Sequence, residues 1–152
     1  MKIDSARFGP MEVPEDRLIE FPKGILGFPN HRQYALIQPN EESVLLWLQS
    51  CEAPELAFVV CDPQVFVSDY RVHVKEDDLK QIGLANPADG QVFVICNKVG
   101  DYLTVNLQGP VLVNCTNRQA RQLVLSDRRF STRHEVLKLT GEPEQATAAK
   151  TA

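Results

Sequence analysis

Short apolar runs separated by turn residues recur along almost the whole chain, at intervals of roughly ten residues. The runs are rich in Val, Ile, Leu and Phe, and several alternate between apolar and polar residues, as half-buried β-strands do. The pattern predicts strands at residues 2–7, 17–21, 34–38, 44–49, 56–61, 70–74, 91–97, 102–106, 111–116 and 121–125.

Glycine, proline, asparagine and aspartate mark the breaks between these runs. Val99, Gly100 and Asp101 separate two strand-like runs and predict a hairpin turn. Residues 75–82 differ, because they have acidic residues at their start, carry Leu79 three positions before Ile82 and are followed by Gly83. This is the pattern of a short amphipathic helix, and residues 117–121 are a candidate for a second helical turn.

Many short strands and few helices predict a mainly β fold, a small antiparallel β-barrel or sandwich-like single domain with one or two short helices. The chain has 152 residues, of which 43% are hydrophobic and 24% charged, and this is enough for one ordinary core. We assign residues 1–139 to this domain. Residues 140–152 contain no large apolar side chain, so we expect a disordered C-terminal tail.

The expected compartment is the cytoplasm. The first residues lack the apolar segment of a secretory signal, and no stretch approaches the ~20 apolar residues of a membrane-spanning helix. Cys51, Cys61, Cys96 and Cys115 are far apart and form no C-x-x-C pair, so we interpret them as reduced thiols.

Charge is unevenly distributed along the chain, whose net charge is −4. Residues 1–116 carry 9 Lys/Arg against 16 Asp/Glu, a balance of −7, whereas residues 117–139 carry 6 against 2, a balance of +4. An acidic body disfavours nucleic acid as a direct partner and suits a basic protein. The small basic segment is equally compatible with a solvated edge.

No recognisable catalytic or metal-binding motif emerges, and we expect no catalytic residue, metal site or cofactor. The three histidines are dispersed, without a second ligand at metal-binding spacing. The chain contains no G-x-S-x-G elbow. The nearest candidate nucleophile is Cys51, where Glu52 and Glu55 would raise the thiol pKa and so disfavour the reactive thiolate.

Residues 21–29, FPKGILGFP, superficially resemble a phosphate-binding loop. Lys23 precedes the glycines, whereas the lysine of a P-loop follows them, and Pro29 lacks an N–H group that a phosphate cradle would use. We therefore expect an ordered turn anchored by Phe21 and Phe28. Either Ile25 and Leu26 are both buried, which composition alone favours, or one of them is presented to a partner.

Four segments together carry a family resemblance: FPKGILGFPNHRQYALI, WLQSCEAPELAFVVCDPQVF, VNLQGPVLVN and NRQARQLVLSDRRFSTRHEV. In this order and spacing the chain resembles the FliW family of flagellar assembly factors, over roughly residues 1–135. The family usually has alanine where this chain has Val105 and Gly109, a difference that affects packing more than chemistry.

The resemblance implies a non-enzymatic regulator on a small β-barrel-like fold. Such proteins bind flagellin in the cytoplasm and, when free, bind CsrA and allosterically antagonise its repression of flagellin mRNA translation. The expected partners are thus CsrA and flagellin, with no direct nucleic acid and no membrane. Two alternatives stay open: a β-barrel module that binds a small ligand or nucleotide, and a hydrolase whose site is assembled from distant residues.

Nine residues are candidates for partner contact under this resemblance. Some carry motif letters in the loop after the run 44–49, some are apolar residues of the segment 21–29, and two are polar residues within strand-like runs that are equally compatible with buried hydrogen bonding. They are Gln49, Ser50, Glu52, Pro54, Ile25, Leu26, Phe28, Asn106 and Asn114.

Overall fold

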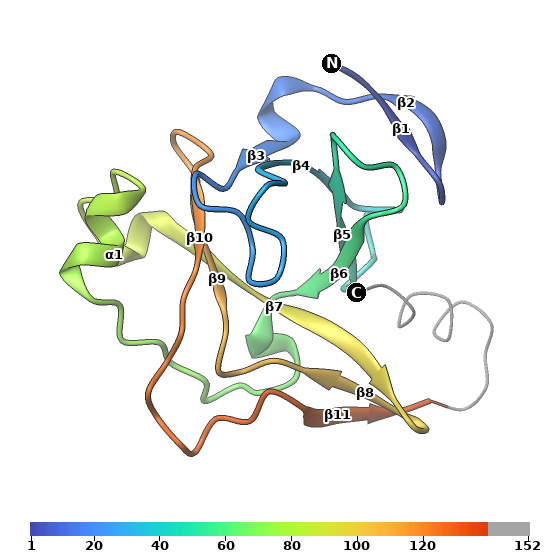
Figure 1. Ribbon diagram of the computed structural model, residues 1–152. Helices are drawn as coiled ribbons and strands as arrows, with labels where there is room; N and C mark the ends of the chain where they lie inside the picture. Colours follow the sequence, from blue (N-terminus) through green and yellow to red (C-terminus); the bar gives the residue numbers. More distant parts are fainter. Residues whose placement is uncertain (140–152) are drawn as a thin grey trace.

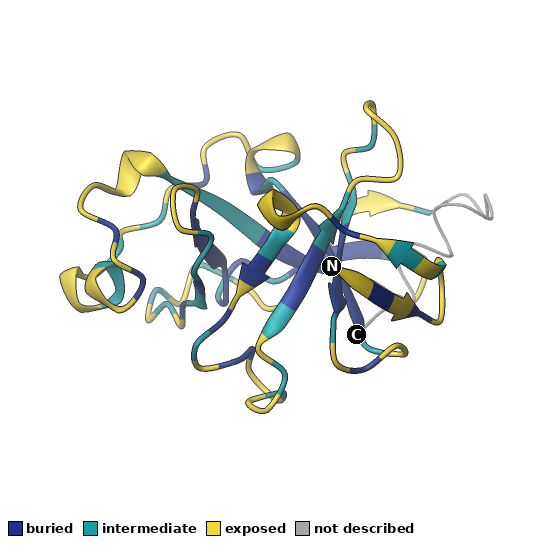
Figure 2. Ribbon diagram, turned by 90° about the horizontal axis from the view of Figure 1, so that it is seen from above, coloured by how far each residue is buried: buried dark blue, intermediate teal, exposed yellow. Residues whose placement is uncertain are grey.

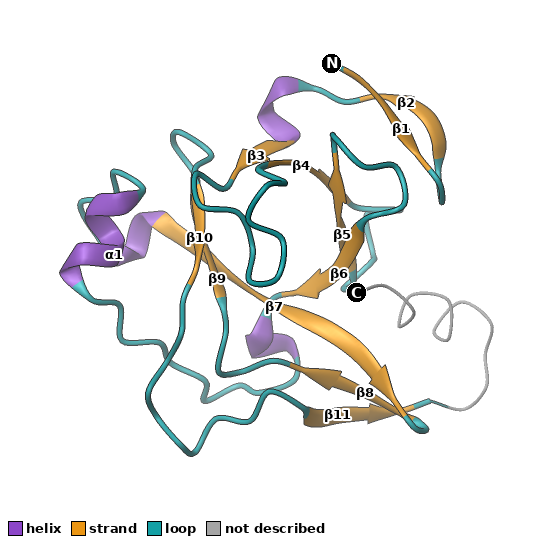
Figure 3. Cartoon of the chain, viewed as in Figure 1, coloured by secondary structure: helices purple, strands orange, loops and turns teal. Residues whose placement is uncertain are grey.

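The computed structural model describes residues 1–139 and is built mainly from antiparallel strands (Figures 1 and 3). The strands are β1 (Lys2–Ser5), β2 (Gly9–Glu12), β3 (Leu18–Glu20), β4 (Gln33–Ile37), β5 (Leu46–Ser50), β6 (Ala57–Cys61), β7 (Gly90–Val99), β8 (Tyr102–Val105), β9 (Val111–Asn114), β10 (Ala120–Gln122) and β11 (His134–Lys138). One α-helix, α1 (Glu76–Gln81), and three short 3-10 helices, Glu15–Arg17, Pro63–Val65 and Pro87–Asp89, complete the described elements. The expected mainly β fold is confirmed.

Nine strands form one sheet with the order β10-β9-β7-β6-β5-β4-β3, and β8 and β11 extend it from β7. The long strand β7 pairs with β9 through its first residues and with β8 through its last. The sheet curls until β3 approaches β10, where the Glu20 N–H donates to the Arg118 carbonyl at 3.0 Å. A single isolated bridge, Glu20 to Gln119, joins these ends, so the described part of the chain has no continuous ladder that closes a barrel.

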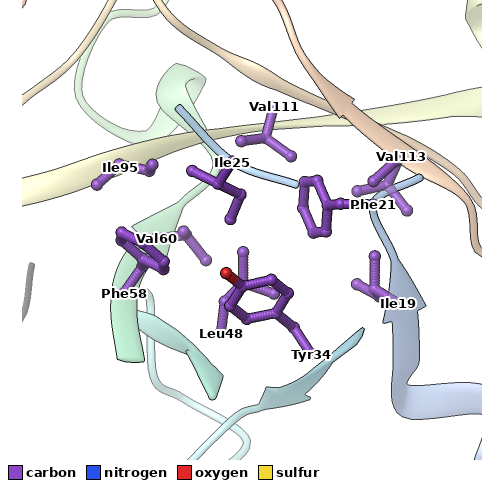
Figure 4. Packing of buried hydrophobic residues seen from close by; sticks show 11 residues of the cluster. Ile19, Phe21, Ile25, Tyr34, Leu48, Phe58, Val60, Ile95, Val111 and Val113 are labelled. Carbon is purple, nitrogen blue, oxygen red and sulfur yellow. The ribbon is translucent and has the colours of Figure 1, made fainter. Parts of the chain in front are cut away.

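Alternation along the strands produces two buried faces. In β5, Leu48 pairs with Phe58 on the inside of the curl, and the neighbouring Trp47 pairs with Val59 on the outside. The inner cluster is drawn in Figure 4 and contains Ile19, Phe21, Ile25, Tyr34, Leu48, Phe58, Val60, Ile95, Val111, Val113 and Ala120. Figure 2 shows that burial is concentrated in the strands, whereas the connecting loops are mostly exposed.

Helix α1 is confirmed within the predicted segment 75–82. Its first turn holds Glu76, Asp77 and Asp78, whose carboxylates favour the positive end of the helix dipole. Gly83 follows at a φ of +67° and allows the chain to turn away. Ile82 and Leu84 pack against Leu112 and Leu123, and this contact fixes α1 beside β10 (Figure 1).

Several predictions about individual elements were wrong. Residues 70–74 alternate between more and less buried positions but pair with no strand, and residues 117–121 contain no helix. Strands β2 and β11 were not predicted. The predicted hairpin between β7 and β8 is confirmed, with Gly100 at a φ of +60°. The expected disordered tail, 140–152, lies outside the described residues.

Candidate protein-binding surface

The segment 21–29 forms a tight loop between β3 and β4 that Gly24 makes possible. Gly24 has a φ of +69°, and a Cβ atom there would lie 2.5 Å from the Phe28 carbonyl oxygen. The Phe28 N–H donates to the Ile25 carbonyl at 2.7 Å, and Gly27 between them has a φ of +88°. Only glycine adopts both conformations without strain, so the two glycines set the path of the loop.

This loop directs its two adjacent aliphatic residues in opposite directions. Ile25 is 2% exposed and points into the inner cluster, among Phe21, Ile95 and Val111 (Figure 4). Leu26 is 62% exposed. Phe28 is half-buried and packs edge-on against Phe58, with ring centroids 5.4 Å apart. The interpretation that composition alone favours, with both residues buried, is therefore wrong for Leu26, and contact of Leu26 with a partner stays a prediction.

Leu26 lies on a surface groove of about 320 Å³ between the loop, β10 and the end of α1. The groove is also lined by Val124, which is 66% exposed and comes from a segment far along the chain. Ile25, Ile82 and Ala120 line it as well, and all three are buried. The two most exposed large aliphatic side chains among residues 1–139 thus line one groove. Exposed apolar side chains are normally scattered singly over a protein surface, so a pair at one groove indicates an interaction site.

Hydrogen bonds hold the two walls of the groove in place. The Leu26 N–H donates to Oε1 of Gln122 at 2.9 Å, and Nε2 of Gln122 donates to the Gly109 carbonyl at 3.0 Å. One glutamine side chain therefore connects the loop, β10 and the turn before β9. The groove is a preformed feature of the fold.

The charged residues that line the groove are both basic. Lys23 is exposed, and Arg121 donates through Nε to Oδ1 of Asp78 on α1 at 2.8 Å. No carboxylate is among the lining residues. Because Arg121 is paired with Asp78, Lys23 is the uncompensated charge among the lining residues, and its sign is opposite to that of the acidic majority of the chain.

The turn between β5 and β6 uses its polar candidates internally. Gln49 is fully buried, accepts a hydrogen bond from Oγ of Ser5 at 2.8 Å, and donates to the carbonyls of Pro54 and Leu56 at 3.1 Å. The Ser50 hydroxyl is also buried and accepts from the backbone N–H groups of residues 52 and 53. These two side chains build the turn and leave almost no polar atom for a partner.

The other two candidates in the same turn, Glu52 and Pro54, are exposed. The Glu52 carboxylate accepts hydrogen bonds from the N–H groups of Gln33 at 2.9 Å and Arg32 at 3.0 Å, and these bonds lower its pKa. Burial and the Glu52 charge raise the pKa of Cys51 to about 11, so this thiol is a poor nucleophile at neutral pH. The predicted direction for Cys51 is confirmed.

The two candidate asparagines also make structural hydrogen bonds. Oδ1 of Asn106 accepts from the N–H groups of Gln108 and Gly109, which shapes the turn before β9. Asn114 is buried, and its Nδ2 donates to the Ile82 carbonyl at 3.0 Å, at the end of α1. Both support the elements that form the groove without lining it.

The nine candidates do not form one site. Of these residues, only Ile25 and Leu26 line the groove, and Ile25, Gln49, Ser50 and Asn114 expose almost no surface in this conformation. Partner contact by each of the nine stays a prediction, which the geometry favours most for Leu26. Lys23, Arg121 and Val124 were not selected from the sequence. The available signal for Val124 was the apolar run Leu123-Val124-Leu125 in the predicted strand 121–125, because alternation along a strand places Val124 on the opposite face from Leu123 and Leu125.

Within residues 1–139 the structure shows no arrangement that indicates a metal site, a membrane-spanning helix or a disulfide bond. Those residues contain no group of three His, Cys, Asp or Glu side chains that would hold a metal ion. No helix in the described range has the length and apolar character needed to cross a membrane. All four cysteines are free, and the buried Cys61 and Cys96 lie with their sulfur atoms 3.5 Å apart.

One curled antiparallel sheet with a preformed apolar groove defines this chain as a small, mainly β domain. The family model described as FliW protein matches residues 2–136. The chain is 36% identical over 140 residues to the flagellar assembly factor FliW of Leptospira interrogans (strain 56601), covering 90% of this chain and 93% of the relative. It is 35% identical over 139 residues to that of Treponema denticola, covering 90% and 94%. This chain belongs to the FliW family of flagellar assembly factors.

The fold agrees with this assignment. A crystal structure of a flagellar assembly factor FliW superimposes with a TM-score of 0.82 at 29% sequence identity, covering 90% of this chain and 97% of the other. The similarity therefore extends over nearly all of both chains. The family-model match over residues 2–136 includes the loop 21–29 and β10, the two segments that form the groove.

Proposed function

We propose that this chain is a non-enzymatic regulator of flagellar assembly that works in the cytoplasm by switching between two protein partners. It binds flagellin and, when flagellin has been exported, binds CsrA and allosterically antagonises CsrA's repression of flagellin mRNA translation. Switching follows from mass action, because export lowers the free concentration of the partner that competes with CsrA.

The observation that carries the proposal is the exposed apolar pair Leu26 and Val124 at a preformed groove of a FliW-family fold. Protein interfaces depend on a few apolar anchors surrounded by a polar rim, and this groove has both. Its walls are held by the Gln122 hydrogen bonds, so binding would require little rearrangement of the loop.

The charge distribution supports the CsrA half of the proposal. Residues 1–116 have a balance of −7, and an RNA-binding repressor is basic where it contacts RNA. Long-range attraction would accelerate the encounter of two such proteins and would weaken as salt screens it. An effect on the association rate is therefore expected at low ionic strength.

No observation favours the alternative of a small-ligand module. The inside of the curled sheet is occupied by the inner cluster, including Phe21, Tyr34 and Phe58 (Figure 4). A small ligand bound inside the curl, as in a ligand-binding β-barrel, would have to displace these side chains.

The direct test mixes the purified chain with flagellin and CsrA from the same bacterium and separates the complexes by size-exclusion chromatography with light scattering. We expect one complex with each partner, and we expect added flagellin to release CsrA. A ternary complex of all three proteins would contradict competition, and failure to bind either protein would overturn the proposal as a whole.

A second experiment concerns charge. Glu55→Lys reverses an exposed charge that makes no hydrogen bond within the described residues, and it should slow CsrA association at low salt. Glu135→Lys, on the exposed strand β11, changes the net charge equally at another place and is the control. If both variants associate with CsrA at the same reduced rate, the effect is due to net charge and not to the position of Glu55. Glu52 is less suitable, because its carboxylate also holds two backbone N–H groups.

A further inference from the structure

We infer that the groove between the loop 21–29 and β10 binds an extended segment of a protein partner that carries an apolar side chain close to a carboxylate. This inference rests on the proposed function, since it names the surface by which a partner is held. Three independent features of the groove specify such a segment.

The first feature is the pair of apolar walls. Leu26 and Val124 are 62% and 66% exposed, and buried Ile25, Ile82 and Ala120 lie between and beneath them. Apolar surface of this kind is stabilised when an apolar side chain removes it from water. The groove volume of about 320 Å³ suits a few side chains and not a whole folded element.

The second feature is an open backbone edge. Among residues 1–139, β10 pairs with β9, the bridge from Glu20 reaches only Gln119, and residues 123–125, which continue the chain past β10, pair with no second strand. The N–H groups of Leu123 and Leu125 donate to Pro110 and Gln108 on the β9 side, at 2.8 and 2.9 Å. Because successive residues of an extended chain direct their backbone groups to opposite sides, those of Val124 face away from β9.

The Val124 N–H has no hydrogen-bond partner within the described residues. A segment of a partner that runs alongside Val124 would supply one, as peptides do when they add to a sheet edge. In such a complex, backbone hydrogen bonds at Val124 would contribute affinity, and the groove would select which side chains of the segment fit. This edge favours an extended occupant over a helical one, whose backbone groups are already paired.

The third feature is charge. Lys23 makes no ion pair with the described residues, and Arg121 uses only its Nε atom on Asp78, which leaves its terminal nitrogens available. No carboxylate lines the groove. A carboxylate on the bound segment would therefore be attracted chiefly by Lys23 and would accept hydrogen bonds from the terminal nitrogens of Arg121, whose charge is partly offset by Asp78.

The test uses Leu26→Glu and Val124→Glu in the full chain, with Val65→Glu as the control. The side chains of Leu26, Val124 and Val65 are all at least half exposed, so each variant should keep its fold and melting temperature. Val65 does not line the groove and is therefore a suitable control. Binding of purified flagellin and of purified CsrA is measured by biolayer interferometry. We expect each groove variant to weaken at least one partner by roughly tenfold or more and the control to change neither.

The charge and backbone features have their own readouts. Lys23→Glu should weaken the same partner, and the matched Lys98→Glu, on the exposed end of β7, should not. Amide exchange followed by NMR should slow at Val124 in the complex. Binding with unchanged exchange at Val124 would overturn the extended segment and point to a helix or a loop.

The outcomes separate the inference from the function on which it rests. If the wild-type chain binds neither protein, the proposed function and the inference both fail. If the wild-type chain binds but both groove variants bind as tightly as Val65→Glu, the function stands and the groove is overturned.

Discussion

Two loops of this protein are built in opposite ways. The loop between β3 and β4 buries Ile25 and exposes its neighbour Leu26, whereas the turn between β5 and β6 buries the polar Gln49 and Ser50. In the first loop an apolar side chain is directed to solvent. In the second, polar side chains are directed inward and their atoms are used by the backbone.

The difference shows that residue type alone does not identify the surface available to a partner. Buried polar groups are accepted in proteins when their hydrogen bonds are made internally, and Gln49 meets this condition. An exposed aliphatic residue carries information when it lies beside another at a hollow, and Leu26 meets that condition with Val124. The turn supports the fold, and the loop exposes the apolar side chain that we propose contacts a partner.

The largest expected effect is a difference in stability between substitutions of Ile25 and Leu26, which are adjacent in the loop. Ile25→Ala removes buried methyl groups from the inner cluster and should lower the free energy of unfolding by about 3 kcal/mol. Leu26→Ala removes an exposed side chain and should change it by less than about 0.5 kcal/mol. Urea denaturation followed by tryptophan fluorescence measures both. Equal losses would mean that Leu26 also belongs to the core.

The next prediction concerns the glycines of the same loop. Gly24→Ala places a Cβ atom 2.5 Å from the Phe28 carbonyl at a positive φ, so the backbone has to shift and stability should fall by about 2 kcal/mol. Gly27→Ala is the matched control, since its φ is also positive but no atom lies within 4 Å of the new methyl group, and it should cost about 1 kcal/mol. The melting temperatures should keep this order. A reversed order would show that the loop does not depend on the close approach at Gly24.

A third prediction moves to the polar turn. Gln49→Leu removes the acceptor of the Ser5 hydroxyl and the donor to the Pro54 and Leu56 carbonyls, and it should destabilise the fold by about 1.5 kcal/mol. These carbonyls keep their bonds to the N–H groups of Ala6 and Ser50, which limits the loss. Gln38→Leu is the control, because its bonds to the Glu41 and Ser43 carbonyls are exposed to solvent, and it should cost less than about 0.5 kcal/mol. If Gln49 instead contacted a partner directly, Gln49→Leu would weaken binding of that partner and leave the free energy of unfolding unchanged.

The sequence predicted the strands where apolar alternation reflects real pairing and failed where pairing depends on distant residues. Strand β2 contains Pro10, which was interpreted as a turn residue, yet the prolyl ring is tolerated because β2 lies at the edge of a two-stranded hairpin. Strand β11 is largely exposed and owes its conformation to pairing with β8. Residues 70–74 are the opposite error, a predicted strand that is absent. Their apolar residues alternate because every second side chain is more buried, but no neighbouring strand pairs with them.

The groove was less accessible to sequence reasoning than the fold. Within FPKGILGFP, Ile25 and Leu26 are chemically alike, and only the backbone path through Gly24 and Gly27 decides which one faces the core. Val124 joins Leu26 through the curl of the sheet, a long-range arrangement that local patterns do not encode. The resemblance to FliW proteins named the family, and the three-dimensional arrangement was needed to bring the two residues together.

The smallest expected effect depends on pH and concerns Glu52, the exposed residue of the polar turn. The N–H groups of Gln33 and then Arg32 hold the pKa of this carboxyl below its ordinary value of 4.5. Because the folded pKa is lower than the unfolded one, the stabilisation is complete above pH 4.5 and is lost as the pH falls through the folded pKa. Glu52→Gln should therefore lower the melting temperature slightly at pH 7, and the gap from the wild type should shrink below pH 4.5. Glu55→Gln removes an equal charge nearby without a hydrogen bond to the described residues and serves as the control. A gap that stays constant on acidification would mean that the two backbone N–H groups gain nothing from the charge of Glu52, and the turn would then hold β4 through its neutral hydrogen bonds alone.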